Sequence, residues 1–195
     1  MFKSEKGAVA IEALFSLMLL FATIYAMWGV SLVIFNQTKL NTATQLSSQA
    51  GLLTVNRTSY RNPTSLNAAL RSRWAAEAVF KENLCGMMAG QFTTGVPARD
   101  TCRSGITGIN ANPMPGPNTN FGTGEAGFNY FIECAQNIST SFSASNCGNP
   151  AANRAVQFRV ESAVYSPFSL MGFFSSSTSS RPKLHSNSAV FSYTP

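Results

Sequence analysis

The dominant pattern in this chain is one long apolar run near its N-terminus. Residues Ala13–Phe35 form 23 positions without a charged side chain, and 19 of them are hydrophobic. As an α-helix this run would be about 35 Å long, whereas the hydrocarbon core of a bilayer is about 30 Å thick. A secretory signal peptide has a shorter apolar core followed by small residues at a cleavage site, and no such site follows here. The pattern therefore predicts a retained transmembrane helix.

The apolar run passes into a polar stretch without a helix-breaking residue. Beyond Phe35, small and apolar residues recur at three- and four-residue steps, as in an amphipathic helix. These residues are Leu40, Ala43, Ser47, Ala50 and either Leu53 or Thr54. We expect one helix from Ala8 to about Val55, near 70 Å long at about 1.5 Å per residue. Its outer half, residues 36–56, is rich in Ser and Thr and needs a domain packed against it.

The rest of the chain, residues 57–195, predicts an α+β domain that opens with a second helix. After a turn before Pro63, we expect this helix to start at a capping Thr64 or Ser65, to reach about Leu84 and to stop at Gly86. Three residues at four-residue steps are expected to face inward: Leu66, Leu70 and Trp74. Two more form an i, i+4 ion pair on the helix surface: Glu77 and Lys81.

A glycine- and proline-rich loop, residues 86–127, precedes three segments of alternating polarity. The loop carries nine of the 14 glycines and four of the nine prolines, and loops of this length are usually functional or mobile. The first segment places four residues on one face: Phe128, Tyr130, Ile132 and Cys134. In the second segment Val156, Phe158 and Val160 share one face of a strand, and Gln157, Arg159 and Glu161 share the other. The last, Leu184–Tyr193, places three on one face: Ala189, Phe191 and Tyr193.

These segments predict a small antiparallel sheet laid on the outer half of the long helix and on the second helix. A serine tract, residues 175–180, precedes the final strand and is expected to be flexible. The fold class is therefore α+β, with a long N-terminal transmembrane and amphipathic helix and a small C-terminal domain.

Charge is sparse throughout the chain. Charged residues make up 11% of the sequence, against about 25% in ordinary globular domains. This composition disfavours a charge-rich disordered chain and a cytosolic enzyme. The net charge of +6 and a pI of about 9.4 favour anionic partners. The basic residues occur in groups of two at most, however, so nucleic acid is an unlikely partner.

Four widely spaced cysteines indicate an oxidising compartment. They are Cys85, Cys102, Cys134 and Cys147. None forms a CxxC pair, and the single His185 cannot complete a usual zinc quartet, so no metal site is expected. Two disulfides are the simplest interpretation, and four buried thiols are the alternative. The sequence leaves three pairings open, and we favour the one that joins neighbours, Cys85 with Cys102 and Cys134 with Cys147.

Motifs for catalysis and cofactor binding are absent or misplaced. Residues 122–127 satisfy G-x-G-x-x-G, but a strand-like run follows them where a dinucleotide site needs a helix. The sequence has no Walker loop, nucleophile elbow or HExxH motif. Glu133 and Glu161 could meet across strands, but nothing else suggests a catalytic carboxylate pair. His185 is expected on the surface. We predict neither an enzyme nor a cofactor.

The start of the apolar stretch holds a single acid. Apolar character begins at Ala8, yet Glu12 lies inside it. A carboxylate at the edge of the bilayer core costs about 2.5 kcal/mol or more if it is buried, so it needs a partner. Glu12 could simply reach the head groups. Alternatively, cleavage after Gly7 would free an amine at Ala8, four residues earlier, which could pair with the carboxylate on the same or a neighbouring chain.

This junction resembles the class III signal of type IV prepilins. Those proteins carry a short basic leader ending in Gly, a Glu at the fifth mature position and a long apolar helix. Here the leader would be residues 1–7 and the transmembrane helix residues 8–35. The stretch GAVAIEALFSLMLLF looks most like the TadE-type pseudopilins of tight-adherence systems. The short major pilins of those systems carry Tyr directly after the Glu, where this chain has Ala13, and are far shorter.

The resemblance implies a minor pilin or pseudopilin that takes part in assembling a type IVb pilus. A prepilin peptidase would cut between Gly7 and Ala8, and Glu12 would set the register between helices. Other pilins, the inner-membrane assembly platform and lipid would be its partners. Small residues would allow close helix approach: Ala8, Ala10, Ala13 and Ser16.

The orientation of the helix in the membrane is inferred mainly from the cysteines. The positive-inside rule gives weak support, because Lys3 and Lys6 precede the helix and Lys39 follows it. The cysteines prefer a periplasmic domain, with the N-terminus in the bacterial cytoplasm. The alternative function is a single-pass, membrane-anchored periplasmic binding or adhesion domain.

Overall fold

A computed structural model describes residues 3–59, 66–88, 126–136, 141–148, 153–165 and 183–193 of the chain. In this part of the chain two helices, three strands and a short 3-10 helix follow one another in order. The helices are α1 (Lys3–Ser59) and α2 (Leu66–Met88), and the 3-10 helix is η1 (Ala144–Gly148). The strands are β1 (Ala126–Ala135), β2 (Ala155–Tyr165) and β3 (Lys183–Tyr193). The predicted α+β class and the order of elements are confirmed.

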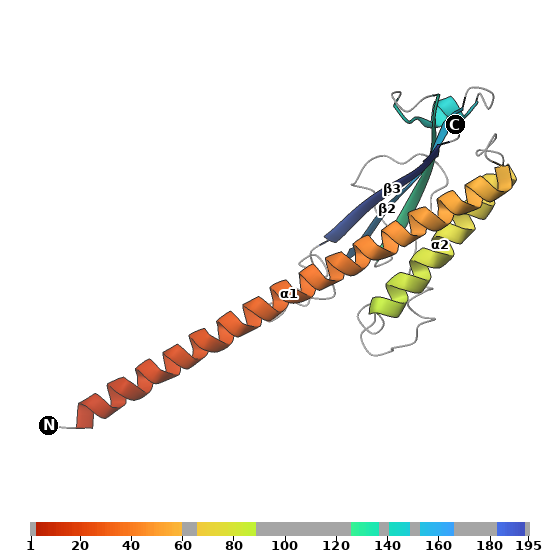
Figure 1. Ribbon diagram of the computed structural model, residues 1–195. Coiled ribbons are helices and arrows are strands. Elements are labelled where there is room, and N and C mark those ends of the chain that lie inside the picture. The colour runs from red at the N-terminus through yellow and green to blue at the C-terminus, as the bar shows by residue number, and fades with distance from the viewer. Residues whose placement is uncertain are drawn as a thin grey trace.

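The long helix α1 forms the spine of the molecule. It has 57 residues and is therefore about 85 Å long. Its N-terminal half projects alone, while its outer half lies between the sheet and α2 (Figure 1). The helix starts before the expected Ala8 and runs four residues past Val55, to Ser59. No proline precedes Pro63, so nothing in the sequence forces an earlier end.

The helix α2 returns along the outer half of α1 (Figure 1). Its buried residues recur every four positions: Ser72, Ala76, Phe80 and Leu84. The expectation that Trp74 faces inward is wrong, because this side chain is 61% exposed. Ala76 allows close approach to α1, where its carbonyl accepts a hydrogen bond from Ser47 Oγ at 2.7 Å. The Phe80 ring contacts that of Phe128 with centroids 5.0 Å apart. These two contacts define the buried face, and Trp74 lies on the opposite one.

Other details of α2 differ less from expectation. The helix continues through Gly86 to Met88, so residues 86–88 belong to the helix and not to the predicted loop. Glu77 and Lys81 form the expected ion pair, with 2.5 Å between Oε1 and Nζ. The side chains of Leu66 and Leu70, and the rest of the loop up to residue 125, lie outside the described residues.

The three strands form an antiparallel sheet in the order β1-β2-β3. Residues of even number face the helices, so Tyr130 stacks on Phe158 with centroids 5.8 Å apart. The predicted inward face of β1 and the alternation of β2 are both confirmed by burial. On β3, Phe191 and Tyr193 share a face as predicted, and that face is exposed. The sheet packs mainly on α1, and β1 also reaches α2.

The interface between α1 and the sheet combines apolar residues with buried hydroxyls. Its apolar part includes Leu40, Ala43, Leu52 and Val55. Of the two residues predicted for the next step, Leu53 is 57% exposed and Thr54 is half-buried, whereas Leu52 is buried. Thr44 Oγ1 lies 2.5 Å from Ser162 Oγ of β2, and Ser48 Oγ lies 2.9 Å from Ser188 Oγ of β3. These hydrogen bonds allow the Ser and Thr side chains on the covered face of α1 to be buried, because each of these hydroxyls has a partner.

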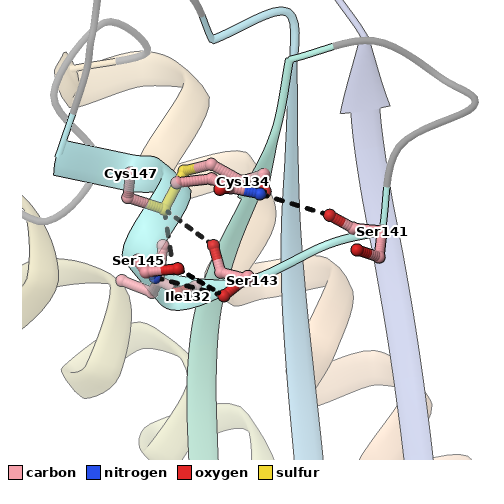
Figure 2. Close-up of a disulfide and its surroundings, with 7 residues drawn as sticks. Ile132, Cys134, Ser141, Ser143, Ser145 and Cys147 are labelled. Carbon is pink, nitrogen blue, oxygen red and sulfur yellow. Dashed lines mark hydrogen bonds between the residues drawn. A yellow bond between two sulfur atoms is a disulfide. The ribbon is translucent and has the colours of Figure 1, made fainter.

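A disulfide ties η1 to the end of β1. Cys134 and Cys147 are bonded, and both are buried (Figure 2). Ser143 adds a short bridge, because its main-chain nitrogen and oxygen pair with those of Cys134 at 3.1 and 3.0 Å. One predicted disulfide is therefore confirmed. Cys102 and the side chain of Cys85 lie outside the described residues, so their pairing stays a prediction.

Candidate membrane segment and its acidic residue

Most of the N-terminal half of α1 is an apolar helix that no other described residue covers. Within Val9–Phe35 most large hydrophobic side chains are about half exposed or more, up to 72% at Met27, whereas Gly29 is buried and Val33 packs against the core of the domain. Of the helices that the structure describes, one is long and apolar enough to cross a membrane, and it includes this segment. Residues 9–35 span about 40 Å along the axis, more than the hydrocarbon core requires. So large an uncovered apolar surface is unfavourable in water and favourable in lipid.

Two hydroxyls in this segment form hydrogen bonds within the helix. Thr23 Oγ1 donates to the carbonyl of Leu20 at 2.8 Å, and Ser31 Oγ donates to that of Met27 at 2.9 Å. A free hydroxyl in hydrocarbon lacks water as a partner, and these local bonds remove that penalty. The polar side chains near the middle of the segment are therefore compatible with lipid.

Aromatic and basic side chains gather where this segment meets the domain. Tyr25 and Trp28 meet edge to face, with centroids 6.3 Å apart. Lys39 Nζ lies 3.9 Å from the centroid of the Phe35 ring. Such side chains are typical of the boundary between lipid and water, because their polar ends reach water while their apolar parts stay in lipid.

The helix changes from mostly uncovered to covered on one face over residues 29–36. Gly29 is buried and Val33 is half-buried against the core, while Phe35 is 51% exposed and Asn36 is 1% exposed. The predicted boundary between residues 35 and 36 stays a prediction. Among the described residues neither side-chain polar atom of Asn36 has a hydrogen-bond partner, so two buried polar atoms are unsatisfied at the junction. No sequence pattern distinguishes this asparagine from its polar neighbours.

Glu12 lies on the uncovered half of α1. It is exposed, and no hydrogen bond or ion pair joins it to another described residue. Ala10, Ala13 and Ser16 are exposed as well, and so are Val9 and Phe15, which lie three residues before and after Glu12, so the surface near the carboxylate combines small and large apolar side chains. Gly7 and Ala8 belong to the first turns of α1, and their side chains lie outside the described residues. Glu12 and Ala8 are one helical turn apart, so they share a face.

The other two acids singled out from the sequence lie on the outer face of the sheet and serve structure. Arg159 of β2 lies between them: its Nη2 is 3.0 Å from Glu133 Oε1, and its Nη1 pairs with Glu161 Oε1. The guanidinium also covers the Phe131 ring at 3.9 Å from the centroid. Glu133 and Glu161 do not lie opposite each other across the strands, since Glu133 pairs with Gln157 and Glu161 with Asn129; both carboxylates bind Arg159 instead. Two carboxylates that share one arginine are poorly suited to acid–base chemistry.

Titratable groups in the domain are few. Burial raises the pKa of the Tyr130 phenol above its ordinary value of 10.0, and the positive charge of Arg73 opposes this shift more weakly. His185 is exposed on β3. Among the described residues, no group of three His, Cys, Asp or Glu side chains could hold a metal ion. No family model, curated protein or solved structure matches the chain.

Proposed function

We propose that this protein is a minor pilin-like subunit, of the TadE type, that takes part in assembling a type IVb pilus. One observation carries the proposal: an apolar half-helix that the described residues leave largely uncovered, with a lone carboxylate at Glu12, continues into an outer half that bears a small α+β domain. This division is what lateral packing of helices in a membrane or filament requires. The residues before the apolar stretch, ending in Gly7, resemble a prepilin leader.

In this proposal a prepilin peptidase cleaves after Gly7 on the cytoplasmic side of the inner membrane. The mature chain begins at Ala8, stands in the membrane through residues 8–35 and holds its disulfide-containing domain in the periplasm. Its role is structural and not enzymatic, since the chain's chemistry lies in helix packing. The subunit can then enter an extracellular filament or act in the membrane during assembly.

Glu12 has a defined task in this proposal. An unpaired carboxylate in lipid is unfavourable by about 2.5 kcal/mol or more, so a helix that supplies an amine at one stagger is preferred over the others. The terminal amine of Ala8, on a neighbouring chain, is such a group. The small side chains of Ala10, Ala13 and Ser16 leave room for that chain to approach.

The second candidate is a membrane-anchored binding or adhesion domain that does not assemble. Two aromatic side chains favour it: Phe191 and Tyr193 are 60% and 43% exposed near the end of the last strand. An anchored domain needs neither cleavage nor a lone acid in its membrane segment. Cleavage after Gly7 therefore distinguishes the two candidate functions.

The test is the intact mass and N-terminal sequence of the protein extracted from the membranes of its natural host. We expect a chain of 188 residues that begins at Ala8, the 195 encoded residues less the seven of the leader. A matched control replaces Gly7 with Leu (Gly7→Leu), which blocks access of the peptidase but leaves the apolar segment intact. A native protein that still begins at Met1 and functions normally would leave only the anchored domain.

A further inference from the structure

The covered face of α1 begins well before the apolar run ends. From Val9 to Ile24 every residue is exposed. From Tyr25 onward, covered positions recur at three- and four-residue steps, which places them on one face of the helix. Tyr25 and Val33 are half-buried, whereas Gly29 and Asn36 are buried. One face of α1 is therefore covered from ten residues before Phe35, although the opposite face remains apolar and exposed.

The sheet also reaches into this stretch of α1. Two contacts show that β3 and α1 run in the same direction: that of Gln37 Nε2 with the carbonyl of His185 at 2.7 Å, and that of Ser48 Oγ with Ser188 Oγ at 2.9 Å. The ladder between β2 and β3 continues for two residues before His185, to the pair of Tyr165 and Lys183. Two strand residues cover about 7 Å, as do four to five residues of a helix, so this end of the sheet lies near the height of Val33.

A sheet that is not closed into a barrel does not lie beside hydrocarbon, because the main-chain polar groups at its end need water or polar partners. The hydrocarbon must therefore end before Val33. Tyr25 and Trp28 meet edge to face on the N-terminal side of this point, and these are the side chains that favour the boundary between lipid and water. The end of the sheet that is nearer to the uncovered half of α1 would then stand just outside the hydrocarbon (Figure 1).

We propose that the hydrocarbon of the bilayer ends at Tyr25 and Trp28, seven residues before the apolar run does, and that the domain rests on the lipid head groups. The inference rests on the membrane anchoring in the proposed function, and it shortens the membrane segment that ended there at residue 35. It names the surface that the domain contacts, which is a layer of phospholipid head groups.

The apolar residues beyond Trp28 fit this layer. The head-group region is about 5–7 Å thick on each side of the bilayer, or about four to five residues of a helix. Residues 29–33 fill it, and Phe35 lies at its outer edge. Lys39 Nζ lies 3.9 Å from the centroid of the Phe35 ring, so an ammonium group stands at this height. Acidic head groups would attract it.

This boundary determines the depth of Glu12. Twenty residues, or about 30 Å, counted back from Trp28 end at Val9, so Glu12 lies about 5 Å inside the hydrocarbon. If the hydrocarbon ended at Phe35, the same count would end at Ser16, and Glu12 would lie about 6 Å outside, among the head groups. An ordinary tilt of about 20° changes the count by about one residue. Only the boundary at Trp28 therefore gives the carboxylate a need for a partner.

Three aromatic residues at seven-residue steps provide a scale of depth for the test: Phe21, Trp28 and Phe35. Each is more than half exposed, and seven residues return to nearly the same face of the helix about 10 Å further along. The chain has two tryptophans, and the other, Trp74, is 61% exposed on α2. Trp74→Phe therefore leaves Trp28 as the one fluorescent tryptophan.

The purified full chain is placed in phospholipid vesicles whose acyl chains carry bromine, which quenches tryptophan fluorescence. The bromine lies either near the head group or near the end of the acyl chain. In the Trp74→Phe chain, the shallow bromine should quench Trp28 about twofold more than the deep bromine, because the boundary lies about 15 Å from the bilayer centre. Equal quenching, or stronger quenching by the deep bromine, would overturn the proposal.

Two matched variants move the fluorescent residue by seven positions in either direction. Both carry Trp28→Phe and Trp74→Phe, and one adds Phe21→Trp while the other adds Phe35→Trp. The first should be quenched more by the deep bromine, and the second little by either. Shallow quenching of the second would place the boundary at residue 35 and contradict the proposal. The Cys134–Cys147 bond must persist in every variant, which shows that the domain folds.

Two outcomes distinguish failure of the inference from failure of the proposed function. If no position is quenched by either lipid, the helix does not enter the bilayer, and the inference fails together with the membrane anchoring. If Trp28 shows the shallow pattern but protein from the natural host retains its leader, the domain rests on the head groups although the proposed pilin function fails.

Discussion

Gly51 of α1 faces the ring of Phe158 of β2 so closely that any side chain at this position would have to displace the ring. A Cβ atom added at Gly51 would lie 2.5 Å from both Cδ1 and Cζ of Phe158, far inside van der Waals contact. The absence of a side chain therefore sets the distance between the spine helix and the central strand. The stacked pair of Phe158 and Tyr130 lies directly on this contact.

Gly51→Ala should destabilise the domain by about 1–3 kcal/mol, because the methyl group forces the Phe158 ring out of its place. This value is a net effect: the cost of displacing the ring is expected to exceed the gain of about 1 kcal/mol that alanine has over glycine in a helix. Urea unfolding of the full chain in detergent measures the difference. Phe158→Leu in the same chain should recover part of it. The matched control is Gly148→Ala, since nothing lies within 4 Å of a Cβ there, and it should be close to neutral.

The disulfide between Cys134 and Cys147 should contribute about 3 kcal/mol to the stability of the domain, as expected for a closed loop with a sequence separation of 13. Replacing both residues with alanine should lower the free energy of unfolding by about that amount, with the sheet retained. A peptide map without reduction checks the connectivity, and it should also show Cys85 joined to Cys102. A peptide that links Cys85 to Cys134 would contradict both pairings.

Glu12→Gln should abolish pilus assembly while membrane insertion and leader cleavage stay normal. The amide is as large as the carboxylate but cannot form the ion pair that sets the register. Counting pili on the cell surface, with intact mass to follow cleavage, checks both parts. Glu12→Asp should retain some assembly, and Ser16→Ala, one turn further along the helix, should have little effect. Normal piliation in the Gln variant would remove the proposed role of the carboxylate.

Tyr130 should make the domain less stable in alkali. Its pKa is raised in the folded chain, mainly by burial, so the unfolded chain loses its proton first as the pH increases. The contribution to stability is complete below about pH 10, and it is lost as the pH rises through the higher pKa of the folded state. Tyr130→Phe cannot ionise and should flatten the decline in the free energy of unfolding above pH 10. An unchanged slope would show that the phenol titrates alike in both states.

Local patterns were sufficient for the elements of secondary structure. Alternation located the three strands to within a few residues, and the lack of proline before Pro63 allowed one continuous helix. Which side of a helix faces the core was harder to infer. Trp74 was expected inside because large apolar residues recur at four-residue steps before it, yet Ala76 and Phe80 are the residues that contact α1 and β1. A single helix pattern does not reveal which face its neighbours will cover.

What the sequence by itself determined is that one N-terminal helix is long and apolar enough to cross a membrane. Twenty-three residues without a charge, with Glu12 just before them, give it this property because charge is unfavourable in hydrocarbon whatever the fold. Only the tertiary structure decided which hydroxyls of α1 meet the sheet, that Gly51 lies under Phe158, and that Arg159 joins Glu133 to Glu161. These contacts join residues distant in sequence, and their partners are fixed by strand register and helix approach, which no local pattern encodes.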